Sequence, residues 1–394
     1  MIGQSSDRIC KTQMRRSIVV IPAYKTEVEH IEAISLIRCR ERLSDFTICF
    51  VAPEGLALDE YYSVVPDARA FFFDKSFFKS VLSYNRLMLS DEFYKCFADY
   101  DYMLIYQLDA LVLDGNLNEF CSLGYDYIGA PWNRLLGIYS FEGREYCASV
   151  GNGGFSLRRV EACRRVLEKH RTIADRWMLN EDVFFSHCGL MYPDDFSVAP
   201  IEVAASFSLE TDADIFIKLN GGKIPFGCHK WQLYCGGYYS EVFNVLKINL
   251  PDRFSFREDD KRFYGNYLYR CALNKLCNEG EMLTRKLPRE IYLYGYGNEG
   301  ERLYKLLIQR KICVLGIYDR ERIGESVGSI VVEDIDKREK ERGEVLITSE
   351  KYETEMCNIL EKMGEIRGTS YYTLADLIFS EDEIEILYKT WRFE

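Results

Sequence analysis

Residues 102–132 constrain the fold more than any other stretch of the chain. The stretch begins with an apolar run, YMLIY, which is long enough for one buried strand and too short for most helices. Asp109 follows this run in the string QLD. Ligands of α/β sheets bind outside the carboxyl ends of the strands, and a carboxylate there can hold a divalent cation against a diphosphate. Asp109 is therefore a candidate ligand contact; the alternative is an aspartate that only starts a turn.

Other apolar runs predict a sheet around this strand. Residues 17–24 (SIVVIPAY) and 46–51 (FTICFV) predict buried strands, and a helical stripe of apolar residues separates them. Residues 70–73 predict a further strand, and 83–97 predict one helix. Strand, helix and strand in succession form a unit of a parallel sheet. We therefore expect an α/β domain with a parallel sheet.

Three later segments place polar groups at turns or helix starts. The string VGNGGFSL at 150–157 has three glycines around an asparagine, which permits positive φ and close approach of the backbone to a ligand. Glu181 and Asp182 begin a predicted short helix, and His229 lies in the turn-like string GCHKW. The structural alternatives are a tight turn, carboxylates favoured by a helix N-terminus, and a histidine hydrogen-bonded under Trp231.

The last third of the chain predicts a second, smaller α/β domain. The string EIYLYGYGNEG at 290–300 places Gly295, Gly297 and Gly300 between a predicted strand and a predicted helix, with Asp319 downstream. This spacing matches a dinucleotide-binding fingerprint; the alternative is glycines that serve only strand–helix packing. We expect a leader at 1–16, a first domain at 17–249, a helical connector at 250–286 and a Rossmann-like domain at 287–394.

Charge and cysteine usage limit the partners. The net charge of −12 argues against nucleic acid or an anionic membrane surface as the main partner. No apolar run approaches the roughly 18–20 residues that span a bilayer, and the N-terminal residues lack the apolar core of a secretory signal. The 14 cysteines are scattered and form no C-x-x-C pair, which is typical of reduced thiols. We expect a cytoplasmic protein.

Five strings together carry a resemblance to a known family: LIYQLDALVL, YDYIGAPW, VGNGGFSLRR, NEDVFF and GCHKW. In this order they resemble a glycosyltransferase-like domain family of unassigned function, which is similar to the GT-A superfamily of nucleotide-sugar transferases. The resemblance covers residues 17–239 and implies a GT-A-like α/β fold for the first domain, with a mixed, mainly parallel sheet and flanking helices. The second domain looks like the small Rossmann-type nucleotide-sugar-binding modules found beside sugar-modifying enzymes.

The resemblance implies a donor site with a divalent cation, Mn²⁺ or Mg²⁺. Asp109 and His229 would be the metal ligands. The donor would contact a set of residues from several segments: Pro22, Ala23, Tyr24, Asn85, Arg86, Gln107, Asp109, Gly153 and Gly154. Gln107 departs from the family pattern, since it replaces the first acid of an Asp-x-Asp motif. A metal-independent site with Lys79 or Arg86 near the diphosphate is therefore an open alternative.

The resemblance also implies the chemistry. Asp182 would be the catalytic base, and Glu181 would position a sugar hydroxyl. We expect a glycosyltransferase of the hexosyltransferase type that moves a sugar from a nucleoside-diphosphate donor to a glycan, lipid-linked or protein acceptor. The donor sugar, the linkage and the stereochemistry stay open at this point.

Three other functions compete with this expectation. The second domain could serve an NAD(P)- or nucleotide-sugar-binding oxidoreductase or epimerase, although it lacks an evident catalytic Tyr-x-x-x-Lys. A nucleotidyltransferase shares the sheet type but normally needs a glycine-rich, arginine-bearing loop, where this chain has IPAYKTEVEH. The third is a non-catalytic nucleotide-sugar-binding protein.

Overall fold

The structure is a computed structural model that describes residues 16–133, 137–231, 246, 268–269, 271–273, 275–276, 287–339, 343–350 and 352–392. The chain divides into two compact units, Met1–Glu210 with Asp214–Lys230, and Thr211–Ala213 with Trp231–Glu394. The leader at 1–16 and the connector at 250–286 lie almost entirely outside the described residues. The predicted domain limits therefore stay predictions.

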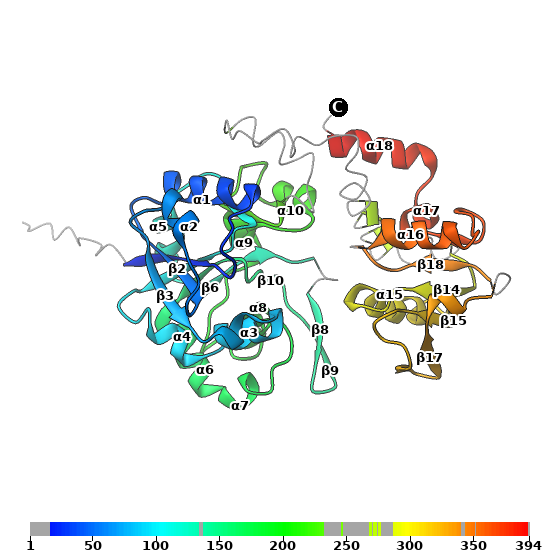
Figure 1. Cartoon of the computed structure of the whole chain (residues 1–394), viewed down its shortest axis with the longest axis horizontal. Helices are drawn as coiled ribbons and strands as arrows, with labels where there is room; N and C mark the ends of the chain where they lie inside the picture. The colour runs from blue at the N-terminus through cyan, green and yellow to red at the C-terminus, as the bar shows by residue number, and fades with distance from the viewer. Residues whose placement is uncertain are drawn as a thin grey trace, which may run out of the picture. The chain divides into compact units, whose positions relative to one another are not determined.

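The first unit contains short and long strands with helices between them (Figure 1). Its strands are β1 (Ser17–Pro22), β2 (Thr47–Pro53), β3 (Arg69–Phe73), β4 (Tyr102–Tyr106), β5 (Ala110–Val112), β6 (Tyr127–Ile128), β7 (Ala130–Pro131), β8 (Ile138–Phe141), β9 (Arg144–Cys147), β10 (Val150–Gly151), β11 (Phe155–Arg159), β12 (Ser208–Leu209) and β13 (Gly227–His229). Its helices are α1 (His30–Arg42), α2 (Asp59–Val64), the 3₁₀ helix η1 (Lys75–Phe78), α3 (Val81–Met88), α4 (Asp91–Lys95), α5 (Leu117–Ser122), α6 (Val160–Lys169), α7 (Arg171–Ala174), α8 (Glu181–Met191), α9 (Ile201–Phe207) and α10 (Ala213–Leu219).

A six-stranded sheet organises this unit. Its strand order is β3-β2-β1-β4-β11-β6. Strands β3, β2, β1 and β4 are parallel neighbours, whereas β11 runs antiparallel to both β4 and β6. The sheet is therefore mixed and mainly parallel, which confirms the predicted α/β class. Since β1 and β4 pair in parallel, their carboxyl ends meet at the same edge.

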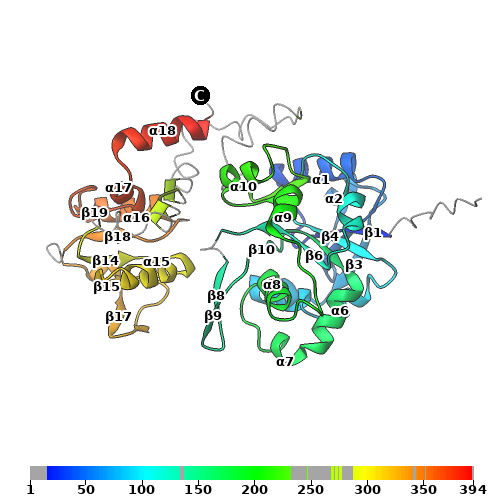
Figure 2. The same ribbon diagram turned by 180° about the vertical axis from the view of Figure 1, so that it is seen from behind.

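Strand alternation divides the hydrophobic core between the two faces of the sheet. On β1, Val19 and Ile21 belong to the cluster that includes side chains of α1 and α2. Ile18 and Val20 belong to the cluster that includes side chains of α3, α4, α6 and α8. Figure 1 shows α1 and α3 on opposite sides of the sheet, and Figure 2 shows the same layers from behind. Each fully buried side chain of this size contributes about 1.5–3 kcal/mol.

The helix predicted at 83–97 is wrong in its continuity. The structure has two helices there, α3 and α4, and the break lies at Leu89 and Ser90. The Oγ atom of Ser90 accepts a hydrogen bond of 3.1 Å from the backbone N–H of Phe93. A serine that satisfies an N–H group at a helix start begins a new helix, so the apolar pattern continues while the helix axis does not.

The second unit contains its own sheet, of order β16-β17-β15-β14-β18-β19. Its strands are β14 (Glu290–Tyr294), β15 (Cys313–Tyr318), β16 (Ser326–Val327), β17 (Ile330–Glu333), β18 (Val345–Ile347) and β19 (Tyr371–Tyr372). Its labelled helices are α15 (Asn298–Gln309), the 3₁₀ helix η3 (Ile335–Lys337), α16 (Glu353–Lys362), α17 (Leu374–Ile378) and α18 (Glu381–Arg392). All strand pairs are parallel except β16 with β17. The segment 319–329, which is described throughout, joins β15 to β17 through β16 without a helix. The Rossmann-like assignment stays a prediction.

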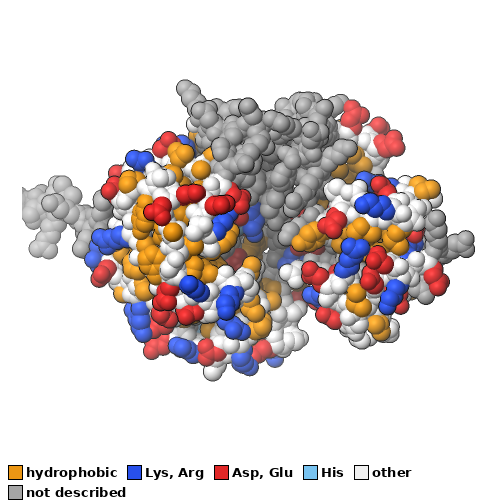
Figure 3. All heavy atoms as spheres, viewed as in Figure 1, with side chains coloured by type: hydrophobic (Ala, Val, Ile, Leu, Met, Phe, Trp, Pro, Cys, Tyr) orange, Lys and Arg blue, Asp and Glu red, His pale blue; other side chains and the backbone are white. Residues whose placement is uncertain are grey.

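The surface charge is mixed where it can be seen. On the face of the first unit in Figure 3, Lys and Arg side chains are interspersed with Asp and Glu side chains. Within the described ranges, every helix is too short or too polar to cross a bilayer. The predicted cytoplasmic location stays a prediction.

Candidate active site

A cavity of about 560 Å³ lies beyond the carboxyl ends of β1 and β4. Pro22 is the last residue of β1, and Gln107, Leu108 and Asp109 follow β4 directly. The lining residues come from segments far apart in the sequence and are Pro22, Tyr24, Glu32, Tyr61, Phe78, Lys79, Ser80, Val81, Tyr84, Asn85, Gln107, Leu108, Asp109, Asn152, Gly153, Gly154, Asn180, Glu181, Asp182, Glu210, His229 and Lys230. Every one of them belongs to the first unit.

The turn at 151–154 packs tightly against two polar side chains of the cavity. Asn152 has a positive φ of 84°, and its Oδ1 atom accepts hydrogen bonds from the backbone N–H groups of Gly154 and Phe155 (3.0 and 3.2 Å). A Cβ atom on Gly153 would lie 2.4 Å from Oε1 of Glu181, and one on Gly154 would lie 2.1 Å from Nε2 of His229. A side chain at either position would therefore clash with its neighbour, so both positions require glycine.

Asp182 holds this turn through its carboxylate. Its Oδ2 atom accepts hydrogen bonds from the backbone N–H groups of Asn152 and Gly153 (3.1 and 3.0 Å), and Oδ1 accepts one from Val183 (2.8 Å). Both oxygens are thus engaged by the backbone. Burial raises the pKa of Asp182, and the negative charge of Glu210 raises it further. The side chain is 8% exposed, so it lies at the inner wall of the cavity.

Glu181 differs from its neighbour because one of its oxygens is free. Its Oε1 atom accepts a hydrogen bond of 2.9 Å from the guanidinium of the fully buried Arg158. Among the described residues, nothing donates a hydrogen bond to its buried Oε2 atom. Burial raises the pKa of Glu181 to about 7, although the charge of Arg158 opposes that shift. A buried, unpartnered carboxylate oxygen is costly unless a ligand or water satisfies it.

Asp109, His229 and Glu210 form a chain of polar contacts across the cavity wall. The Nε2 atom of His229 lies 3.1 Å from Oδ1 of Asp109, and its Nδ1 atom lies 3.1 Å from Oε1 of Glu210. Lys230 reaches the same Glu210 oxygen at 3.3 Å. Burial alone would lower the pKa of His229, but the two carboxylates outweigh burial and raise the pKa to about 9.

The structure brings most of the predicted site residues together. Those that line the cavity are Pro22, Tyr24, Asn85, Gln107, Asp109, Gly153, Gly154, Glu181, Asp182 and His229. Ala23 does not line it, because the residue is buried and its N–H donates to the carbonyl of Val51. Arg86 lines a different cavity. The roles of these residues stay predictions.

Several cavity residues were not among the predicted ones. Asn152, Asn180 and Lys230 lie inside the strings VGNGGFSLRR, NEDVFF and GCHKW, so the motifs themselves pointed to them. Glu210 had no such signal, since it enters the site only through its contacts with His229 and Lys230. Tyr84 lines the cavity from α3 and was hidden within an ordinary helical pattern.

A divalent cation would find two suitable side chains here. Carboxylate oxygen and imidazole nitrogen are both common ligands, and Asp109 and His229 present one of each, 3.1 Å apart, at the cavity wall. Within the described part of the chain, no group of three His, Cys, Asp or Glu side chains is placed to hold a metal ion. The remaining ligands would therefore have to come from a bound diphosphate or from water.

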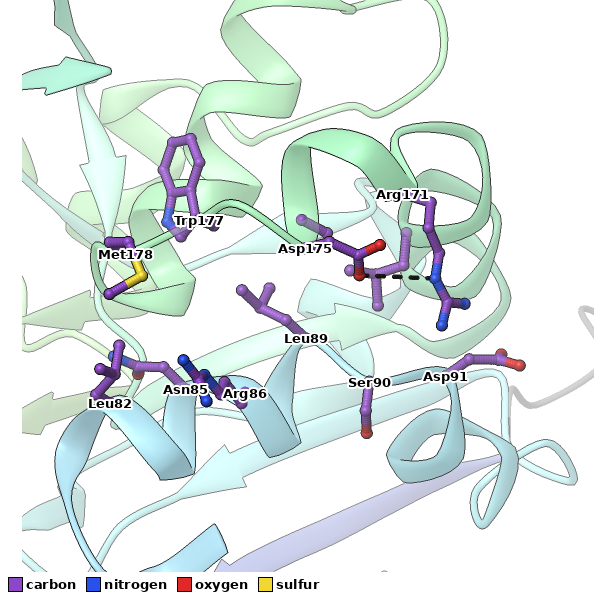
Figure 4. Close-up of a pocket in the computed structure, with 12 residues that line it drawn as sticks. Leu82, Asn85, Arg86, Leu89, Ser90, Asp91, Arg171, Asp175, Trp177 and Met178 are labelled. Atoms are coloured by element: carbon purple, nitrogen blue, oxygen red, sulfur yellow. Dashed lines mark ion pairs between the residues drawn. The ribbon is translucent and has the colours of Figure 1, made fainter. Parts of the chain in front are cut away.

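A second cavity, of about 250 Å³, lies on the other side of α3 (Figure 4). It is lined by Leu82, Asn85, Arg86, Leu89, Ser90, Asp91, Leu167, Arg171, Ala174, Asp175, Trp177 and Met178. Figure 4 shows Arg86 and Asn85 on α3 and Arg171 and Asp175 across the cavity. Asn85 is the residue shared by the linings of the two cavities.

In the glycine motif of the second unit, Gly295 and Gly300 are required by the conformation and close packing of the backbone. Gly295 has a φ of 103°, and a Cβ atom on Gly300 would lie 2.1 Å from the carbonyl oxygen of Gly295. Gly297 has open space beside it. Asp319 accepts hydrogen bonds from the N–H groups of Tyr296, Glu321 and Arg322. Since both of its oxygens are engaged by the backbone, a ribose would have to displace these bonds, and nucleotide binding here stays a prediction.

Comparison with known proteins gives similarities at low identity. The model of a family described as a protein of unknown function (DUF5672) matches residues 67–229, which is less than half of the chain. No curated protein matches the chain. Among solved structures, the galactosyltransferase LgtC in complex with donor and acceptor sugar analogues has 17% identity and a TM-score of 0.38, covering 60% of this chain and 98% of that chain.

Two further solved structures are similar to the same degree. The bifunctional glycosyltransferase WbbM has 13% identity and a TM-score of 0.39, covering 64% of this chain and 52% of its own. The glycosyltransferase GlyE of Streptococcus pneumoniae TIGR4 has 12% identity and a TM-score of 0.35, covering 96% of this chain and 100% of its own. The fold class and the site described above rest on this chain's own contacts.

Proposed function

We propose that the first unit transfers a sugar from a nucleoside-diphosphate donor to an acceptor hydroxyl. The observation that supports this most is that one cavity gathers the residues after β1 and β4, the turn at 151–154, the start of α8 and the end of β13. The nucleobase of such a donor needs a surface on which to stack, and its diphosphate needs positive charge nearby. The acceptor hydroxyl needs a general base that takes its proton. The cavity volume of about 560 Å³ falls within the roughly 300–1,000 Å³ of ligand pockets.

The donor contacts follow from the lining. Tyr24 is 62% exposed at the cavity rim, so its ring is available to stack on the base. Lys79 and Lys230 bring ammonium groups to the same cavity, where they would attract the diphosphate. Gly153 and Gly154 let the turn pack against Glu181 and His229, two side chains that line the cavity where the donor would bind.

Asp109 and His229 would hold a divalent cation if one binds, with Mn²⁺ the better match to a carboxylate and imidazole pair. The cation would supply charge that offsets the leaving diphosphate. Lys79 and Lys230 supply positive charge from the chain itself, which is the arrangement expected of a metal-independent site.

Glu181 is the better candidate for the base. Its Oε2 atom is free among the described residues, whereas both oxygens of Asp182 already accept backbone hydrogen bonds. A carboxyl with a pKa near 7 suits proton transfer at neutral pH. In an inverting transfer, Glu181 would take the proton of the acceptor hydroxyl while that oxygen bonds to the anomeric carbon and the bond from this carbon to the diphosphate breaks. Asp182 would hold the turn that positions the donor.

A thermal-shift panel of nucleotide sugars, with and without Mn²⁺, tests the donor site. A ligand that binds only the folded protein stabilises it by about 2.7 kcal/mol at a concentration of 100 Kd. We expect at least one nucleotide sugar to raise Tm, with a further increase in Mn²⁺. Asp109→Asn should remove the Mn²⁺ increment, while Asp67→Asn, at an exposed site outside the cavity, should keep it. If no nucleotide sugar stabilises the wild-type protein, the proposed function is wrong.

A further inference from the structure

Arg158 is a charged side chain enclosed in the core of the first unit. It lies on β11 between β4 and β6, where it pairs in register with Met103 and Tyr127, and it is fully buried. Arginine is almost never fully buried unless its charge is paired. Arg158 does not line the cavity of the candidate active site, but its partner Glu181 does. Any effect of Arg158 on chemistry in the cavity therefore acts through Glu181.

Hydrogen bonds hold the guanidinium of Arg158 at all three of its nitrogen atoms. Nε donates to Oγ of Ser156 (3.0 Å), and Nη1 donates to the hydroxyl of Tyr94 (3.1 Å). Nη2 donates to Oε1 of Glu181 at 2.9 Å and to the carbonyl oxygen of Gly153 at 3.5 Å. The group thus links the start of α8 to the turn that contains Gly153. A planar guanidinium with a partner at each nitrogen has little freedom to rotate.

Two aromatic rings pack against the same guanidinium. Its Cζ atom lies 5.6 Å from the ring centroid of Tyr127 and 5.2 Å from that of Phe185. Such rings attract a cation and keep water away from it. The pair of Arg158 and Glu181 therefore lies in a dry environment, where charges interact more strongly than at the surface.

These contacts fix one end of the Glu181 carboxylate. Arg158 holds its Oε1 atom, and among the described residues nothing donates a hydrogen bond to its Oε2 atom. Because both oxygens belong to one planar group, fixing Oε1 also limits where Oε2 can lie. The nearby positive charge favours the ionised carboxylate, which is the form that can accept a proton.

The other titratable groups around Glu181 do not supply such a charge. The groups whose charges interact with it are Arg158 on β11, Asp182 on α8, Tyr84 on α3, Tyr94 on α4, Tyr127 on β6 and Cys163 on α6. Burial raises the pKa of the three tyrosines and of Cys163, so these four stay neutral near pH 7. Asp182 raises the pKa of Glu181, whereas Arg158 lowers it. Within this set, Arg158 is therefore the group that favours the ionised form.

We propose that Arg158 is a positioning residue of the transfer reaction: it holds Glu181 through Oε1 and keeps the carboxylate ionised, so that Oε2 can take the proton of the acceptor hydroxyl. Arg158 itself exchanges no proton in this step. Stability alone does not require the pair, since apolar side chains of similar volume often stabilise a core as well as a buried ion pair does. The inference rests on the proposed function.

The first test is a carboxyl-¹³C NMR titration of the full-length protein, in which the Glu181 signal is the one that Glu181→Gln removes. In wild type we expect a midpoint near pH 7. Arg158→Lys keeps a positive charge but loses the planar set of donors, so the midpoint should rise by about one pH unit. Tyr94→Phe removes one anchor of the guanidinium and should cause a smaller rise. Tyr102→Phe is the matched control, because the Tyr102 hydroxyl accepts from Arg159 instead, and it should titrate as wild type.

The second test follows turnover against pH, as the release of nucleoside diphosphate from the stabilising nucleotide sugar. In wild type the rate should fall as the pH drops below about 7, because a protonated Glu181 cannot act as a base. In Arg158→Lys the loss should begin about one pH unit higher, and the rate should recover towards wild type at high pH. A purely structural role would lower turnover by the same factor at every pH.

Two results would overturn the proposal: Glu181 titrates at the wild-type midpoint in both Arg158→Lys and Tyr94→Phe, or the pH profile of turnover does not shift in these variants. If Arg158→Lys does not fold, Tyr94→Phe serves in both tests. The tests also separate this proposal from the transfer reaction. If wild type releases no nucleoside diphosphate from any nucleotide sugar, the transfer reaction is overturned. Normal release with an unshifted profile contradicts only the role of Arg158.

Discussion

Glu181 and Asp182 are neighbours in sequence, yet their carboxylates meet different surroundings. Asp182 accepts hydrogen bonds from the turn at 151–154. Glu181 meets the buried Arg158 through Oε1, and among the described residues nothing donates a hydrogen bond to its buried Oε2 atom. The sequence predicts two acids at the start of a helix but cannot show which one the turn engages. That difference depends on contacts across about 30 positions of the chain, which no local pattern encodes.

We expect the two amide variants to separate turnover from stability. Glu181→Gln should lower turnover by about 10²–10⁴-fold if it removes the base, as measured by kcat on folded protein. Asp182→Asn places an amide against two backbone N–H groups and should cost about 1–3 kcal/mol of unfolding free energy. Glu119→Gln, on the exposed side of α5, should change neither. A turnover loss in Asp182→Asn without loss of stability would restore Asp182 as the base.

At the scale of elements, hydrophobic periodicity predicts which strands exist better than where helices begin. The strands at 17–22 and 102–106 are confirmed. Their apolar runs have to be buried and are too short for most helices, so each forms a strand. Helix α1 begins at His30, where Glu32 accepts a hydrogen bond of 2.8 Å from the N–H of Glu29, and the apolar stripe does not show this contact. The break between α3 and α4 was missed because a single group, the Ser90 hydroxyl, starts the second helix, and the apolar pattern does not show it.

The cap at Ser90 gives a direct stability prediction. Ser90→Ala should lower the unfolding free energy by about 1 kcal/mol, because it removes the acceptor for the N–H of Phe93. Urea denaturation measures the change. Ser63→Ala is the control, since the one hydrogen bond of the Ser63 hydroxyl within the described part of the chain goes to the carbonyl of Glu60 in α2, and it should stay within about 0.5 kcal/mol of wild type. An equal loss in both variants would contradict the capping role.

At the scale of the molecule, each unit contains a buried carboxyl whose pKa is raised by burial. In the second unit Glu353 is buried, and nothing described donates a hydrogen bond to its Oε2 atom. Burial raises its pKa to about 8; the charges of Asp376 and Glu350 add to the shift, and Arg367 opposes it. A carboxyl with a raised folded-state pKa stabilises below the unfolded value of about 4.5 and loses that contribution as pH rises towards 8.

We therefore expect Glu353→Gln to make the second unit less sensitive to pH. Above pH 8 the variant should be more stable than wild type by an amount on the order of a few kcal/mol, and at pH 5 the two should be close. Hydrogen-exchange mass spectrometry of 353–362 at both pH values measures this. Glu355→Gln, exposed on the same helix, should follow wild type. A wild-type unit whose protection rises from pH 5 to pH 8.5 would contradict the prediction.

Release of nucleoside diphosphate from the stabilising nucleotide sugar, compared between wild type and Asp109→Asn, tests the central claim most directly. The Asp109 carboxylate lies just after β4, inside the cavity, where it contacts His229. Loss of one strong electrostatic stabiliser lowers rates by about 10²–10³-fold, so we predict at least a hundredfold slower release in the variant. Equal release by the two proteins would contradict sugar transfer at this site.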